Sequence, residues 1–169
     1  MKTIRSARQD DGPQLVAVGM RAWESAVEGW VNTGLLRENA ERAFIAFVAN
    51  NYLSIDVMEQ GGRILAWAAR ENFDNKISDI WVEPDHHGQG LGTELLARLE
   101  SEIEANGYDR AMIETHAQNV RAIEFLKKRG YSISWMTAVW SPQLDREVDT
   151  VGMVKAITQG ERAQAYGEF

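Results

Sequence analysis

A glycine-rich turn between a strand-like and a helix-like segment constrains this chain more than any other feature. The residues of the turn are His87, Gly88, Gln89, Gly90, Leu91, Gly92 and Thr93. Residues 77–82 before it are rich in β-branched and aromatic side chains, and residues 93–106 after it follow a helical period. Glycines let the backbone approach a ligand closely, and a helix start offers unpaired N–H donors and the positive end of its dipole. The turn therefore predicts a site for a phosphate or pyrophosphate.

The order of the expected elements argues against a doubly wound parallel sheet. A hairpin is expected across residues 60–62, and glycines end the helices at 107 and 130. The expected segments are a strand at 3–8, helices at about 10–26 and 37–50, strands at 53–59, 63–72 and 77–82, a helix at 93–106, a strand at 110–116, a helix at 119–129, and strands at 131–140 and 148–157. This β-α-α-β-β-β-α-β-α-β-β order predicts an α+β fold with a mixed sheet. We expect a single domain over residues 1–157 and a C-terminal tail over 158–169.

Composition narrows the class of protein. The formal net charge is -7 and the chain has no basic run, which argues against a nucleic-acid-binding surface. No apolar run approaches the length of a membrane span. The chain has 0 cysteines, so it has no disulfide framework, thiol nucleophile or cysteine zinc site, and this fits a cytoplasmic protein. The acidic balance suits a cationic acceptor, although most acidic proteins are acidic for solubility.

Two blocks make the chain resemble the GCN5-related N-acetyltransferase (GNAT) superfamily of acetyl-CoA-dependent acyltransferases. The first block, Ile80-Trp81-Val82 followed by Pro84 and the glycine turn, is similar to the family's acetyl-CoA signature. The second block runs from Asn119 to Tyr131 and is similar to the family's Asn…Ala…Phe-Tyr-Glu-Lys-Leu-Gly-Phe segment. The resemblance covers the chain from Ile4 to about Ile157. It implies a mostly antiparallel twisted sheet flanked by helices, and an enzyme that moves an acetyl group to a primary amine by direct attack on the thioester.

The resemblance also implies where acetyl-CoA binds. Backbone N–H groups from Gly88 to Thr93 would hold the pyrophosphate, without a metal. The pantetheine arm would run beside Ile80, Trp81 and Val82, and Asn119 would reach the cofactor from the next helix.

Two positions depart from the family pattern. His87 stands where the family has Gln or Arg; a neutral imidazole still donates one hydrogen bond, and we expect modestly weaker pyrophosphate binding. Leu126 stands where many members have the tyrosine that protonates the departing thiolate, which leucine cannot do. Another group, water, or departure without protonation are the alternatives, and Tyr131, Tyr108 and His116 are candidate donors.

Acetyl transfer requires a group that accepts a proton from the ammonium or from the tetrahedral intermediate. Glu114 is the first candidate, because some members, including the ribosomal-protein N-terminal acetyltransferases, have a catalytic glutamate there. Asp79 is the second. The structural alternatives are an arginine ion pair for Glu114 and an ion pair or turn contact for Asp79, and a water chain could replace either. A backbone N–H of the Ile80–Val82 strand would meet the oxyanion.

Other functions and sites remain as alternatives. A dinucleotide-binding oxidoreductase would need glycine where Thr93 stands, together with repeated βαβ units. A non-catalytic acyl-CoA-binding or regulatory module gains weight from Leu126. The 3 histidines suggest a metal site as a hypothesis, but their spacing does not support it. Residues 23–36 and 141–148 are expected to shape the acceptor pocket. For Trp23 and Trp30 within this region, packing in the core is the preferred interpretation and a place in the pocket is the alternative. We expect a small-molecule amine rather than a protein as acceptor, and a homodimer is one option for assembly.

Overall fold

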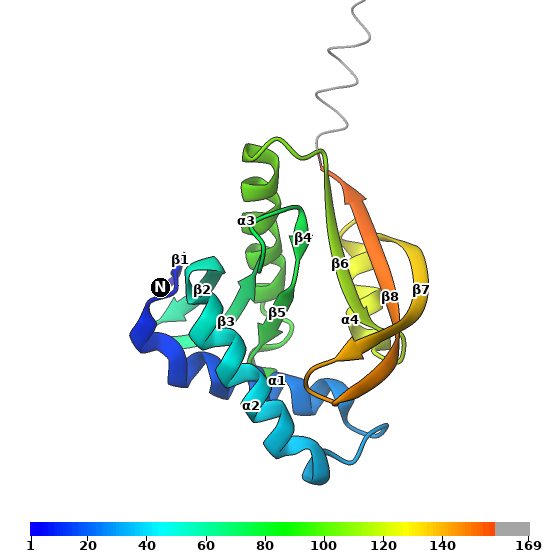
Figure 1. Cartoon of the computed structure of the whole chain (residues 1–169). Helices are drawn as coiled ribbons and strands as arrows, with labels where there is room; N and C mark the ends of the chain where they lie inside the picture. Colours follow the sequence, from blue (N-terminus) through cyan, green and yellow to red (C-terminus); the bar gives the residue numbers. More distant parts are fainter. Residues whose placement is uncertain (158–169) are drawn as a thin grey trace, which may run out of the picture.

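The computed structural model describes residues 1–157 as two four-stranded sheets with helices on both sides (Figure 1). The tail expected at 158–169 lies outside the described residues. All strand neighbours are antiparallel except β4 and β6, which are parallel. The first sheet has the order β1 (Lys2–Ser6), β2 (Ile55–Gln60), β3 (Arg63–Ala69), β5 (Asp79–Val82), and the second β4 (Lys76–Ile77), β6 (Arg110–His116), β8 (Arg146–Ala156), β7 (Ser132–Ser141). The predicted α+β, mostly antiparallel architecture is confirmed.

The segment predicted as one strand over 77–82 is divided at Ser78. Ile77 pairs with Ile113 of β6, whereas Asp79 pairs with Ala69 of β3. The backbone N–H of Ser78 donates to the Ala69 carbonyl oxygen at 2.9 Å, and its hydroxyl donates to the same oxygen at 3.2 Å. Because the chain changes its partner strand here, the two sheets part beyond Ser78. One edge of β5 and the last residues of β6 are left without a strand between them.

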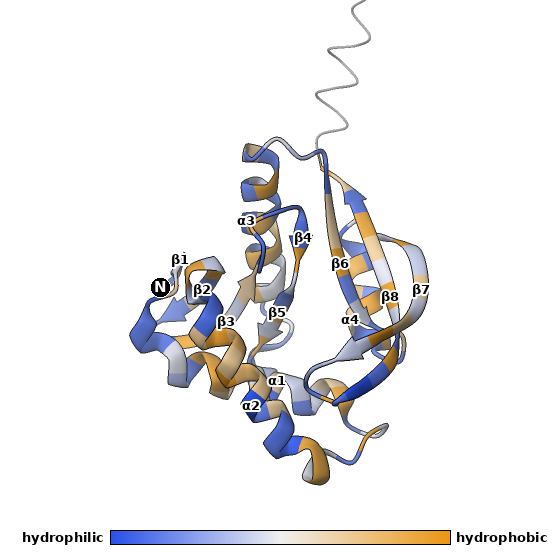
Figure 2. Ribbon diagram, in the orientation of Figure 1, coloured by the Kyte–Doolittle hydropathy of each residue, from blue (hydrophilic) through white to orange (hydrophobic). Residues whose placement is uncertain are grey.

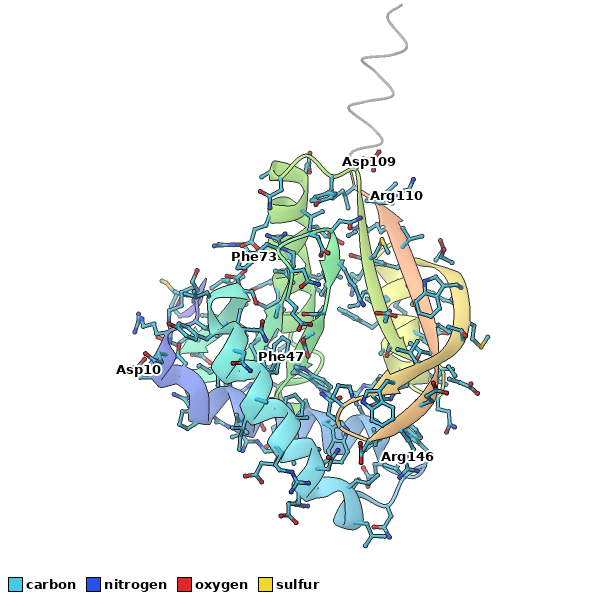
Figure 3. The ribbon with its side chains drawn as sticks, in the orientation of Figure 1. Asp10, Phe47, Phe73, Asp109, Arg110 and Arg146 are labelled. Atoms are coloured by element: carbon cyan, nitrogen blue, oxygen red, sulfur yellow. The ribbon has the colours of Figure 1, made fainter. Side chains whose placement is uncertain are left out.

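Helices cover both faces of the sheets and produce two apolar cores. Helices α1 (Gly12–Val27) and α2 (Thr33–Asn51) lie on one face, and α3 (Leu91–Ala105) and α4 (Val120–Lys128) on the other (Figure 1). Phe47, labelled in Figure 3, extends from α2 and stacks on the ring of Trp67, with centroids 6.0 Å apart. On α3 a buried stripe faces the other core, as the banded colouring of Figure 2 illustrates. Its residues are Leu91, Leu95, Leu96, Leu99 and Ile103.

Several element boundaries differ from those expected. Helix α2 begins at Thr33 instead of residue 37, because the Asn32 side chain accepts a hydrogen bond from the Leu35 N–H at 3.3 Å and caps the helix. The strand expected at 63–72 ends at Ala69, where the chain turns toward β4. Within residues 1–157, none of the helices combines the length and the apolar character that a membrane span requires.

Candidate active site

A cleft of about 740 Å³ lies where the two sheets part, a volume typical of sites for small molecules and cofactors. It is lined by β5, the end of β6, the starts of α3 and α4, and the last turn of α1. Of the residues predicted to bind the cofactor or to catalyse, all but Gln89 line the cleft; those that do are Asp79, Ile80, Trp81, Val82, His87, Gly88, Gly90, Leu91, Gly92, Thr93, Glu114 and Asn119. Gln89 is exposed, and its side-chain oxygen lies 3.1 Å from Nδ1 of His86. A second hollow of equal volume between α1 and α2 lies apart from these residues, and within it Glu24 pairs with Arg37.

The glycine turn forms one end of the cleft and presents N–H groups to it. Gly88 and Gly90 have φ angles of +79° and +81°, a backbone conformation that favours glycine. Gly90 is the N-cap of α3, and no side chain caps the helix there. The N–H groups of the first turn, and the positive end of the helix dipole, are therefore available to an anion.

Basic side chains reinforce this end, and two of them, Arg121 and Arg129 of the α4 region, were missed in the sequence. Both line the cleft, and Nε of Arg129 donates to Oγ1 of Thr93 at 3.1 Å. Burial, followed by the charge of Arg121, holds the pKa of His87 below its usual value, so this imidazole is neutral near pH 7. Both arginines could have been identified from the sequence, because they lie within the segment Asn119–Tyr131 that resembles the family.

Asn119 has a local role as well as a place in the cleft. Its side-chain oxygen accepts a hydrogen bond from the Ala122 N–H at 3.2 Å and caps α4. This bond uses the amide oxygen, so the amide NH₂ group remains able to donate toward a ligand.

The free edge of β5 supplies backbone donors and acceptors along the cleft. β5 pairs only with β3, and the Glu83 N–H donates to the Leu65 carbonyl oxygen at 2.8 Å. In an antiparallel ladder the N–H groups alternate in direction, so those of Ile80 and Val82 turn away from β3 and into the cleft. A pantetheine arm has amide groups that match such an edge.

Asp79 has the electrostatic character of a general base. It is half-buried where β5 begins and lines the cleft. Burial raises its pKa to about 7, although the indole N–H of Trp81, which donates to its Oδ1 at 3.0 Å, acts in the opposite direction. Its carboxylate is therefore near half-protonated at neutral pH.

Glu114 lines the same cleft but is ion-paired. Its carboxylate binds Nζ of Lys76, the residue that pairs with Met112 where β4 meets β6. The structural alternative considered for Glu114, an ion pair, is thus present, with a lysine in place of the expected arginine.

The tyrosine position of the family is occupied by a buried leucine. Leu126 is 3% exposed and lies in the core beside the cleft. Tyr131 is buried, and its hydroxyl donates to Oε2 of Glu100 at 2.8 Å, which together with burial raises its pKa. Tyr108 is exposed in the turn after α3. None of the three candidate donors lines the cleft. His116, at the end of β6, contacts the ring of Trp30, which does line it.

None of residues 141–148, which were expected to shape the acceptor pocket, lines the cleft; this segment packs on α2 instead. The Asn39 side chain of α2 donates to the carbonyl oxygens of Pro142 and Gln143, at 2.7 and 2.8 Å. Leu144, in the same turn between β7 and β8, is 1% exposed and belongs to the core under α1 and α2. This turn approaches α1 and α2 in Figure 1, and Figure 3 labels Arg146 beside it.

The two tryptophans considered for the acceptor pocket have different positions. Trp30 lines the cleft, and its ring meets that of His116 edge-on, with centroids 5.5 Å apart. Trp23 is a core residue, 1% exposed, which confirms the preferred interpretation of packing. Among residues 1–157 no cluster of three or more His, Cys, Asp or Glu side chains could hold a metal ion.

A cleft between parted strands, with an uncapped helix start at one end and a carboxylate beside a free strand edge, fits an acyltransferase that uses a phosphate-bearing thioester cofactor. Residues 18–131 match the model of the acetyltransferase (GNAT) family. The chain belongs to this family and is an N-acetyltransferase that uses acetyl-CoA.

Individual relatives agree with this assignment. The chain is 27% identical over 121 residues to the [ribosomal protein bS18]-alanine N-acetyltransferase of Escherichia coli (strain K12), covering 70% of this chain and 81% of that protein. It is 24% identical over 139 residues to the L-methionine sulfoximine/L-methionine sulfone acetyltransferase of Pseudomonas paraeruginosa (strain DSM 24068 / PA7), covering 78% and 81%. The fold is similar to that of the PaiA N-acetyltransferase from Thermoplasma acidophilum, solved in complex with coenzyme A, with a TM-score of 0.76, 15% identity, and coverage of 92% and 99%.

Proposed function

We propose that this enzyme transfers the acetyl group directly to a primary amine in a ternary complex, with Asp79 as the general base. The observation that carries the assignment is the position of Asp79, which lines the cleft where β5 begins, beside the free edge of that strand. Burial there raises its pKa to about 7. A base works best when its pKa lies near the working pH. Asp79 is therefore preferred to Glu114, which binds Lys76.

The chain's residues divide the reaction between them. Asp79 accepts a proton from the acceptor ammonium, directly or through one water, so that a neutral nitrogen attacks the thioester carbon. The N–H groups of Ile80 and Val82 donate to the oxygen that becomes negative as the new C–N bond forms. The C–S bond then breaks, and the thiolate leaves beside Leu126, which supplies no proton. The attacking nitrogen releases a proton as the new C–N bond forms. The thiolate is protonated either by this proton or by water.

The cofactor end is assigned to the same residues that line the cleft. The N–H groups from Gly88 to Thr93 bind the pyrophosphate, with Arg121 and Arg129 supplying positive charge. The donor set fits the group, because uncapped N–H groups and guanidinium groups match a dianionic pyrophosphate without a metal.

We propose a small-molecule amine rather than a protein as acceptor. The carboxylates of Glu28 and Asp79 line the cleft, and the formal net charge is -7, so the site suits a small cationic amine. Of the two relatives named above, one is named for a protein substrate and the other for small molecules. A cytoplasmic location and a homodimer remain predictions from the sequence.

A panel of amines with acetyl-CoA, read as free thiol released, tests the proposal. We expect turnover with small amines, and a kcat/KM that rises with pH through the pKa of Asp79. The regulatory module remains the alternative: tight coenzyme A binding with no thiol released for any amine would favour it. Comparing the variants Asp79→Asn and Glu114→Gln identifies the base, because the pH dependence should disappear only in the first.

A further inference from the structure

The charged side chains of the cleft are separated by sign between its two faces. Those contributed by the α4 region are Arg121 and Arg129, both basic. Those on the side of α1 are Glu28, Asp79 and Glu114, all acidic. Asp79 and Trp81 are two positions apart on β5, so their side chains point to the same face of the sheet. This is the face covered by α1 and α2, because the ring of Trp81 contacts that of Phe44 of α2. The anionic cofactor and the acceptor thus meet opposite electrostatic environments.

The end of α1 adds to the negative potential of the acceptor side. The last turn of α1 lines the cleft through Ser25 and Ala26, so the negative end of the helix dipole lies there. Glu28 follows directly, as the C-cap. A carboxylate at a helix C-terminus opposes the dipole and does not stabilise the helix. Within residues 1–157 no basic side chain forms an ion pair with Glu28.

No basic side chain on this side is available for a carboxylate on the acceptor. Among the described lining residues, Arg121 and Arg129 belong to the cofactor end. Lys76 lies nearby but is bound to Glu114. An amino acid would bring its own carboxylate against these negative groups, whereas a second ammonium group would be attracted to them.

We propose that the acceptor is a short diamine or polyamine, with one amino group reacting beside Asp79 and a second bound by the Glu28 carboxylate at the end of α1. This proposal rests on the proposed function: it assumes that acetyl transfer takes place in this cleft, and it uses the charges of the cleft to choose among amines as acceptor. Trp30, on the same side, provides an aromatic ring for the alkyl chain or for a cationic group.

The test compares three amines of matched length at saturating acetyl-CoA: putrescine, butylamine and γ-aminobutyrate. We expect kcat/KM for putrescine to exceed that for each of the others by about fivefold, the upper range for one ion pair with an exposed carboxylate such as Glu28. Glu28→Gln should raise KM for putrescine about threefold while kcat is retained, because the contact binds and does not react. Glu104→Gln removes the same charge from the exposed face of α3 and serves as the control.

The outcomes separate this inference from the function on which it rests. Equal turnover of γ-aminobutyrate and putrescine, a better rate with an alanine-terminated peptide, or identical kinetics for Glu28→Gln and Glu104→Gln would overturn the diamine proposal while leaving the acetyltransferase intact. Bound acetyl-CoA with no thiol released for any of these acceptors would overturn the proposed function itself.

Discussion

Replacing Asp79 by asparagine should lower turnover and raise stability in the same protein. The side chain keeps nearly the same shape and still accepts the hydrogen bond from Trp81, 3.0 Å away in the wild type, but it cannot take up a proton. General-base catalysis contributes about 10²-fold or more, so kcat should fall by about that factor at pH 8. Acetyl-CoA affinity should change little, because the glycine turn and the arginines are untouched.

The size of the effect on the free energy of unfolding follows from the pKa of Asp79. A carboxyl raised from 3.8 to about 7 is protonated in the folded protein where it is ionised in the unfolded chain. The free energy of unfolding therefore decreases as pH rises through this window, and above it the full cost of the buried charge is present. At about 1.36 kcal/mol per pKa unit the cost is at most about 4 kcal/mol, which solvent access to a half-buried group reduces.

Two assays test this prediction: the pH dependence of kcat/KM and unfolding by urea. For the wild type, kcat/KM should rise about fivefold from ~pH 6 to ~pH 7 and about twofold more by ~pH 8, as expected for a base with a pKa of about 7. In Asp79→Asn this rise should be absent, and urea unfolding at ~pH 8 should show a higher free energy of unfolding than the wild type. A variant that keeps the wild-type pH profile, or that is less stable at ~pH 8, would refute the reasoning.

Three further predictions concern the cofactor end and the core. Gly90→Ala places a Cβ at a φ of +81° and should lower stability by about 1 kcal/mol and weaken acetyl-CoA binding in calorimetry; unchanged affinity would contradict the anion site. His87 has a lowered pKa that a bound phosphate would raise, so acetyl-CoA affinity should increase as pH falls toward 6, and His87→Gln, unlike His86→Gln, should remove this dependence. Asp56, buried beside Glu102, has its pKa raised to about 7, so stability falls from about pH 4 to about pH 7; Asp56→Asn should reduce that fall in unfolding curves, and an unchanged slope would argue against it.

The sequence predicted the order of elements and a glycine turn at the start of a helix, because these depend on local chemistry. The glycines at 88 and 90 are required by backbone conformation, and apolar spacing on residues 91–103 shows which face of α3 is buried. Position 119 follows from the motif, although its capping of α4 was not anticipated.

What the sequence could not show depends on long-range contacts. A strand-like run over 77–82 carries no signal that its partner changes at Ser78, yet this change separates the sheets and opens the cleft. The order of preference between the two carboxylates likewise depends on neighbours: Lys76 is 38 positions from Glu114 in sequence, and the burial of Asp79 is set by packing. Trp23 and Trp30 look alike in the sequence, but only Trp30 reaches the cleft.

The most direct test of direct acetyl transfer follows the label from acetyl-CoA carrying a ¹³C-acetyl group, with putrescine as acceptor and mass spectrometry of amine, protein and acetate. The mechanism predicts label in the acetylated amine alone, dependent on the protein and strongly reduced in Asp79→Asn. Label retained on the protein, or found only in free acetate, would contradict direct attack by the amine in this cleft.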